Sequence, residues 1–280
     1  MRYPWQLLFH SIPFILSGWL SGNLAAQHLD LRIEDEAGVA IPYVSTYLPS
    51  AGRGALGDEA GLVNLDTKSL QPEDTIVLSC LSYRPDTLLF AEVRDKTDTT
   101  IVLAEEPYEL AGVTISAAII KYKRKRLGDI RRPNNAAFDV TQLLPPGEIG
   151  KIIEVDRPVR VDSLTIYIDQ SEIDSFMVEV NIYDYQLKYP GRALQNERLI
   201  FSVVSHTDEY VFDLTARPLT LDKDVLVTLK ALRYPQDLQK GVLLIGARIG
   251  THRGLQRRPD GAWSRPYVSP AMTLHVRVPK

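Results

Sequence analysis

The stretch HLDLRIE at residues 28–34, followed by the turn DEAG at 35–38, places Leu29, Leu31 and Ile33 on one face of an extended segment. Alternate side chains share a face of a β-strand, so this spacing predicts a strand that buries one side. Similar segments, separated by glycine-rich or acidic turns, follow at residues 39–48, 62–65, 74–80, 84–93 and 99–103. The pattern predicts a small antiparallel β-sandwich at the beginning of the chain.

Alternation returns after residue 139. The segments lie at residues 150–155, 161–168, 176–185, 198–204, 210–214, 224–232, 242–249 and 272–278. Eight such strands favour a jelly-roll-like sandwich. A chain of 280 residues, 45% of them hydrophobic, is long enough for two domains. We therefore expect an all-β fold of two β-sandwich domains, the second over residues 139–280.

A basic, proline-broken stretch separates the two strand-rich regions. It includes KYKRKR at residues 121–126 and RRPNN at 131–135, and it predicts a linker over residues 117–138. The alternative is a phosphate- or lipid-binding patch, with Tyr122 as its aromatic residue. The whole chain has a formal charge of −3. A net charge of that size gives no overall field that favours nucleic acid, so we expect no nucleic-acid partner.

The first 26 residues have the order of a secretory signal: Arg2, an apolar run at residues 7–20, and the small-residue exit LAA. We expect cleavage after Ala26. A membrane anchor is the alternative, but the run is shorter than the roughly 20 residues that a spanning helix needs, and Pro13 interrupts it. Because no second long apolar run follows, the mature chain should have no transmembrane segment. The single cysteine, Cys80, cannot form an internal disulfide, and we expect it to be a buried strand residue.

The segments IPYV (41–44), GDEAGLVNL (57–65) and DTIVLSCLSY (74–83) resemble the carboxypeptidase regulatory-like, or transthyretin-like, family found in secreted and envelope proteins of Bacteroidetes. The resemblance covers residues 27–103, although residues 81–83 lack the usual glycine. It implies a transthyretin/prealbumin-like sandwich, which we expect over residues 27–116, with residues 108–115 as a joining strand. In that family the matching positions are structural, so the resemblance implies no activity.

Candidates for catalysis are few. His206 and Glu209 have the His-x-x-Glu spacing of zinc carboxypeptidases, but they fall between two predicted strands, and nothing in the sequence places His252 or His275 beside them as a third ligand. Acidic pairs such as Asp35-Glu36, Asp58-Glu59 and Asp222 with Asp224 lie at turns, where solvated carboxylates are expected; a calcium site or glycosidase-like acids are the alternatives. We expect no catalytic residue, no bound metal and no cofactor.

A long loop at residues 251–267 is the candidate recognition site. Its candidate ligand-binding residues are Arg253, Arg257, Arg258, Trp263, Arg265 and Tyr267. The aromatic residues can stack on a sugar ring or a peptide while the guanidinium groups engage carboxylate or phosphate. The alternative is that Trp263 closes one end of the sandwich core.

These features predict an exported, non-catalytic binding or structural β-sandwich protein of the bacterial cell envelope, in the periplasm or at the cell surface. Its expected partner is an envelope protein or a glycan. Two alternatives remain: a secreted zinc-dependent hydrolase that uses the His206 region, and an accessory of TonB-dependent outer-membrane import, since similar domains precede the plugs of those receptors.

Overall fold

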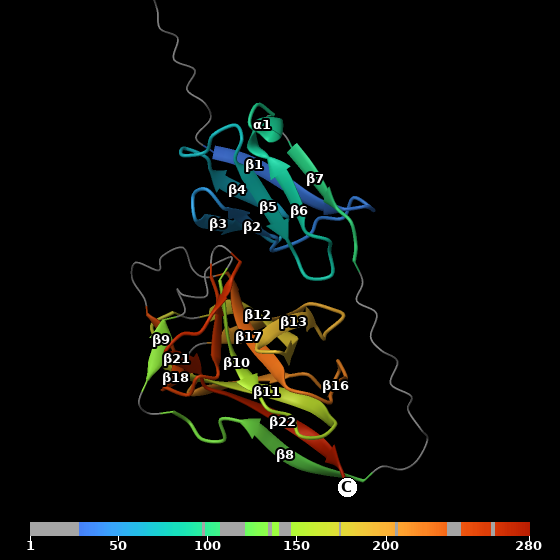
Figure 1. Cartoon of the computed structure of the whole chain (residues 1–280), viewed down its shortest axis with the longest axis vertical. Helices are drawn as coiled ribbons and strands as arrows, with labels where there is room; N and C mark the ends of the chain where they lie inside the picture. The colour runs from blue at the N-terminus through green and yellow to red at the C-terminus, as the bar shows by residue number, and fades with distance from the viewer. Residues whose placement is uncertain are drawn as a thin grey trace, which may run out of the picture.

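The computed structural model describes residues 28–96, 99–106, 121–133, 136–139, 147–173, 175–204, 207–233, 242–258 and 261–280. Within these ranges the regular structure is almost entirely β-strand, gathered into two bodies that follow one another along the chain (Figure 1). Each body has its own hydrophobic core between two sheets. The expected all-β sandwich fold is confirmed.

The first sandwich packs a sheet in the order β4-β1-β7 against a sheet in the order β3-β2-β5-β6. Its strands are β1 (His28–Asp35), β2 (Ser45–Leu48), β3 (Arg53–Leu56), β4 (Leu62–Asp66), β5 (Thr75–Ser79), β6 (Asp86–Leu89) and β7 (Thr99–Leu103). β1 pairs antiparallel with β4 and parallel with β7. As the alternation predicts, Leu29, Leu31 and Ile33 point into the core, and the residues between them face outward.

Besides the parallel pairing of β1 with β7, which departs from the expected antiparallel sandwich, three details of the first sandwich differ from the sequence prediction. The segment 84–93 ends in a short helix, α1 (Phe90–Val93), because Phe90 and Val93 lie on one helical face and both enter the core. The glycine-rich loop contains β3, which Gly52 makes possible by turning the chain at a φ of 61°. Strand β2 begins only at Ser45, since Tyr43 has a φ of 57° and leaves the extended conformation.

The second sandwich packs a sheet in the order β13-β12-β17-β10-β19-β20 against a sheet in the order β21-β18-β11-β22-β8. β14 pairs with β12, β15 and β16 pair with β11, and β9 pairs with β18. The strands are β8 (Tyr122–Gly128), β9 (Ala137–Asp139), β10 (Glu148–Ile153), β11 (Val159–Ser171), β12 (Ser175–Gln186), β13 (Tyr189–Ala193), β14 (Leu199–Val204), β15 (Glu209–Asp213), β16 (Leu219–Leu221), β17 (Val225–Arg233), β18 (Leu243–Ile249), β19 (Gly254–Arg257), β20 (Trp263–Ser264), β21 (Val268–Pro270) and β22 (Met272–Pro279).

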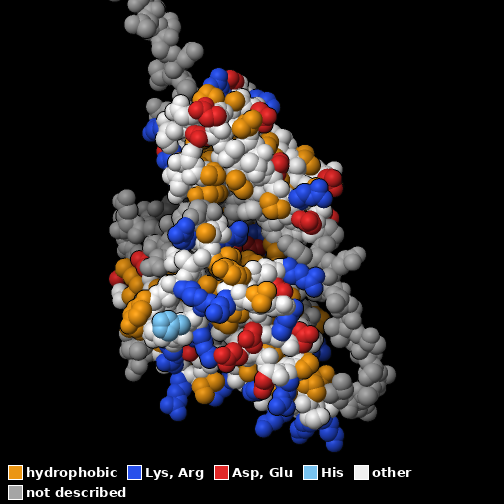
Figure 2. Space-filling view, in the orientation of Figure 1, with side chains coloured by type: hydrophobic (Ala, Val, Ile, Leu, Met, Phe, Trp, Pro, Cys, Tyr) orange, Lys and Arg blue, Asp and Glu red, His pale blue; other side chains and the backbone are white. Residues whose placement is uncertain are grey.

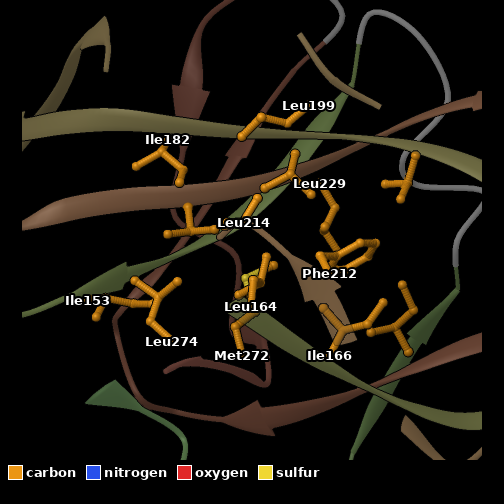
Figure 3. Close-up of a cluster of buried hydrophobic side chains, with 14 of the residues drawn as sticks. Ile153, Leu164, Ile166, Ile182, Leu199, Phe212, Leu214, Leu229, Met272 and Leu274 are labelled. Atoms are coloured by element: carbon orange, nitrogen blue, oxygen red, sulfur yellow. The ribbon is translucent and has the colours of Figure 1, made fainter. Parts of the chain in front are cut away.

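Figure 3 shows the core of this second sandwich. Ile153 and Ile182 come from one sheet, and Leu164 and Leu274 come from the other. Phe212 of β15 is fully buried among them. Burial of such side chains contributes about 1.5–3 kcal/mol each. Because the core strands cannot move without opening this layer, the side chains on their outer faces are held on a rigid base.

The linker expected over residues 117–138 needs correction. Residues 122–128 form strand β8, which pairs with β22 from Tyr122↔Pro279 to Gly128↔Thr273. Leu127 anchors the strand in the core, while the charged residues before it are exposed. An edge strand can be this polar because solvent covers the face and edge that no neighbour occupies. The second sandwich therefore includes residues before 139.

Several sequence predictions lie outside the described residues. They are the signal peptide with its cleavage after Ala26, the joining strand at 108–115, and the position of His206. Among the residues that the structure does describe, none forms a helix long and apolar enough to cross a bilayer.

The two sandwiches touch at Arg198, which also forms a buried ion pair within the second sandwich. Arg198, just before β14, donates through Nε to Glu179 of β12 at 2.6 Å and through Nη1 to the carbonyl oxygen of Pro42. Its guanidinium group lies 5.9 Å from the centre of the Tyr43 ring. The Tyr43 hydroxyl lies 3.4 Å from Sδ of Met177. Arg198 thus joins a buried carboxylate of the second sandwich to the backbone of the first.

Candidate functional site

The predicted recognition loop at 251–267 is largely part of a sheet. β19 pairs with β10, and β20 returns along β19 with Arg257 opposite Trp263. The hairpin therefore extends the sheet that contains β12, β17 and β10, on the β10 side. Side chains of the hairpin lie over the outer face of that sheet instead of standing free in solvent.

The arginines of this loop are directed to different partners within the protein. Arg253 pairs with Glu154 at 2.8 Å, and Arg257 pairs with Glu148 at 3.3 Å. Arg265 donates to the Tyr185 hydroxyl at 2.6 Å. Arg258 lies at the hairpin turn, where its backbone N–H donates to Ala262 at 2.8 Å, and Tyr267 is 72% exposed. Arg253, Arg257 and Arg265 thus contact three different residues of the second sandwich.

Trp263 packs against the outer face of the sheet. Its ring meets the Tyr183 ring edge-on at 5.8 Å, and it covers a small apolar cluster of Ile152, Leu226 and Leu255. The side chain is half-buried. Trp263 thus packs on a small apolar cluster on the outer face of the sheet, which is separate from the core between the two sheets.

Beneath the hairpin, Glu148 of β10 is a buried carboxylate with several donors. Tyr183 donates to it at 3.0 Å, Thr228 at 2.9 Å and Arg257 at 3.3 Å. Burial, and then the negative charge of Glu148, raise the pKa of Tyr183 well above its ordinary value. Tyr183 therefore stays protonated and keeps donating. A carboxylate enclosed by donors in this way fixes the hairpin to the sheet.

The acidic residues at turns also have local partners. Asp35 accepts from the backbone of Ala37 and Val39, and Asp58 accepts from Ala60 and Leu62 in the same pattern. Both carboxylates close their turns by accepting backbone N–H groups, as expected for acidic turn residues.

The His206 region is described only in part. Glu209 is the first residue of β15 and is exposed, and Asp208 pairs with Arg132 at 2.9 Å. In the ranges that the structure covers, no three His, Cys, Asp or Glu side chains are close enough to hold a metal ion.

A groove of about 760 Å³ lies on the outer face of the other sheet of the second sandwich. It crosses β8, β22, β11 and β15, and we call it the basic groove. Its lining residues are Arg124, Lys125, Arg126, Asp162, Ser163, Val211, Asp213, Thr215, His275, Val276 and Arg277. Lysine and arginine side chains gather at this end of the molecule, far from the first sandwich, where β8 and β22 lie (Figures 1 and 2).

The two sides of the basic groove differ in charge. On the β8 side, the Arg124 guanidinium makes no ion pair or hydrogen bond within the described part of the chain, and Arg126 reaches only the carbonyl of Ile130 at 3.5 Å. In the middle, Arg277 pairs with Asp162 at 2.7 Å.

On the β15 side, Asp213 accepts hydrogen bonds from the backbone and hydroxyl of Thr215. These bonds lower the pKa of Asp213, which keeps the carboxylate ionised. Lys125, on the β8 side, pairs with Asp156 at 3.5 Å. The groove therefore runs from two guanidinium groups that have no ion-pair partner among the described residues, those of Arg124 and Arg126, to a carboxylate.

Sequence reasoning placed the candidate site elsewhere. The signal for the basic groove was present in residues 121–126, where arginine and lysine alternate, and a phosphate- or lipid-binding patch was one alternative for them. Without the pairing of β8 to β22, however, nothing in the sequence brings residues 122–128 next to residues 162, 213 or 275.

No protein-family model and no curated protein matches the chain. Solved structures give distant likenesses. A structure of infectious bursal disease virus strain Gt covers 91% of this chain and 80% of its own, with 9% identity and a TM-score of 0.28. A major pilin subunit of Bacillus cereus covers 88% of this chain and 68% of its own, with 11% identity and a TM-score of 0.20. Likenesses this weak carry no argument about function.

Proposed function

We propose that this protein is an exported, non-catalytic binding protein of a bacterial cell envelope, and that it binds its ligand in the basic groove. The observation that carries the proposal is the groove itself. It is an open, polar surface on rigid strands, and it holds arginine side chains whose charge the described residues do not neutralise. Such groups are available to a ligand, whereas the arginines of the 251–267 loop already have partners in the fold.

The buried carboxylates support a binding role over a catalytic one. Glu148 accepts from several donors, and Glu179 pairs with Arg198 and Lys230. Each is held by the fold and neither lines the groove. Export is supported by the signal-like first 26 residues.

The test has two parts. Protein produced in its own bacterium should be recovered outside the cytoplasm with Gln27 as its first residue. The purified mature protein, immobilised on a column, should then retain envelope polysaccharide and release it in salt with its chain length unchanged.

A double variant, Arg124→Glu with Arg126→Glu, should lose that retention. Lys68→Glu with Lys96→Glu makes the same change in net charge on exposed residues of the first sandwich, and this control should retain the polysaccharide normally. Cytoplasmic protein that keeps Met1, shortened polysaccharide in the eluate, or equal loss in both variants would each contradict the proposal.

A further inference from the structure

We infer that the ligand of the basic groove is an acidic oligosaccharide, a chain of sugar rings that carry both carboxylate groups and free hydroxyls. This inference rests on the proposed function and names the class of ligand that the same groove takes.

Side chains of different chemistry follow one another in order across the groove. Strand pairing sets Arg126 opposite His275, His275 opposite Ser163, and Ser163 opposite Asp213. Directly opposed residues point to the same face of a sheet, so these side chains form one row across the strands. The row begins with a guanidinium group, continues with an imidazole and a hydroxyl, and ends with a carboxylate.

The two ends of this row of side chains suit different groups on a ligand. The guanidinium groups of Arg124 and Arg126 suit a carboxylate on the ligand, because arginine donates two parallel hydrogen bonds to a planar anion. The carboxylate of Asp213 is an acceptor with more lone pairs than Thr215 uses, and it suits donors such as ring hydroxyls. A ligand that satisfies both ends must combine anionic groups with hydroxyl donors, as acidic sugars do.

An acidic peptide suits the groove less well than an acidic sugar. Asp213 lines the groove and can accept a hydrogen bond from a ring hydroxyl, whereas a peptide whose side chains are all anionic offers Asp213 no side-chain donor. The row also crosses the strands over about 14 Å, given the usual spacing between neighbouring strands. A peptide that added to the free edge of β8 would run along the strand and would not reach Ser163 or Asp213.

Protection of the sheet edge explains only part of the charge on β8. Lysines on an edge strand discourage pairing with other chains, and Lys123 can serve that purpose. Arg124 and Arg126 lie on the face that Arg277 and His275 share, since each is directly opposite one of them. Their charge is thus presented to the groove as well as to the edge.

The experiment is calorimetric titration of the mature protein with three probes: an oligogalacturonate, the same oligosaccharide with its carboxyl groups reduced to alcohols, and poly-glutamate. We expect the oligogalacturonate to bind at least about tenfold more tightly than either of the others, and its affinity to fall as salt is raised. Equal binding of the reduced oligosaccharide, or tighter binding of poly-glutamate, would overturn the inference while leaving a binding function in place. Failure of all three probes to bind would also overturn it, and the retention test above would then decide on the function.

The Asp213→Asn variant separates specific recognition from simple attraction. Removing a negative charge from the groove should strengthen the binding of any anionic ligand that is held by charge alone. If Asp213 accepts a sugar hydroxyl, the change should instead weaken oligogalacturonate binding by about 5- to 10-fold. Ser163→Ala, which keeps the turn at Thr215 intact, should weaken it in the same direction. Strengthened binding in Asp213→Asn with no effect of Ser163→Ala would contradict the assignment.

Discussion

Replacing Arg198 by alanine tests how the two sandwiches are held together. Arg198 is only 13% exposed and its partner Glu179 is 2% exposed, so the ion pair lies almost wholly out of solvent. The variant removes the 2.6 Å bond to Glu179, the bond to the Pro42 carbonyl and the stacking on Tyr43. It also leaves a buried carboxylate with one cation, Lys230, at 3.6 Å.

The expected cost follows from these contacts. Removing one partner of a buried ion pair costs about 3–5 kcal/mol. Because Lys230 remains beside Glu179, we expect about 3 kcal/mol, at the lower end of that range. Arg217 provides a matched control, since it also pairs with a glutamate, at 3.0 Å, and stacks 5.9 Å from a ring, but it is 36% exposed. Its replacement by alanine should cost less than about 1 kcal/mol.

Urea unfolding followed by circular dichroism gives the free energy of unfolding of both variants, and small-angle scattering gives the separation of the domains. Arg198→Ala should be the less stable variant and should have a larger radius of gyration than Arg217→Ala. If the two variants unfold at the same urea concentration and scatter alike, Arg198 does not hold the sandwiches together.

Three further predictions concern stability. Trp263→Ala should lower the free energy of unfolding by about 3 kcal/mol, because the ring packs on Tyr183; a thermal melt unchanged from wild type would argue against packing. Gly150→Ala should cost about 1–3 kcal/mol or more in urea unfolding, since a Cβ there collides with the Val227 carbonyl; a neutral effect would mean that the β10–β17 pairing is looser than described. Burial alone would raise the pKa of Glu179, but the charges of Lys230 and Arg198 outweigh it, so the pKa is lowered. The stability from this carboxylate is present above the unfolded value of 4.5 and is lost as pH falls through the lower folded value. In Glu179→Gln the free energy of unfolding should therefore fall less over that acid range than it does in the wild type. An equal fall in the variant and the wild type would contradict the lowered pKa of Glu179.

The alternation of apolar residues was enough to predict most of the fold. In strands such as β1, every second residue from Leu29 to Ile33 is apolar and buried, and such a pattern can be read without tertiary information. Short strands were missed where the pattern is too short or too polar to read. β8 has a single buried residue, Leu127, and β20 is only two residues long.

The candidate site could not be predicted for a related reason. Composition favoured the 251–267 loop, which is rich in arginine and aromatic residues. Its arginines, however, meet acidic or hydroxyl partners that come from distant strands, as Arg253 meets Glu154 and Arg265 meets Tyr185. Whether a charged side chain is neutralised depends on such pairings, which sequence spacing does not reveal. The residues of β8 were predicted to be part of a linker, yet the arginines of this strand remain available to a ligand.

The most direct test of the account is an NMR titration of the mature protein with the oligogalacturonate, observing the Nε–Hε signals of the arginine side chains. The account predicts that the signals of Arg124 and Arg126 shift with added ligand and that those of Arg253 and Arg265 stay in place. Shifts confined to Arg253 and Arg265 would contradict it, and would return the binding site to the 251–267 loop.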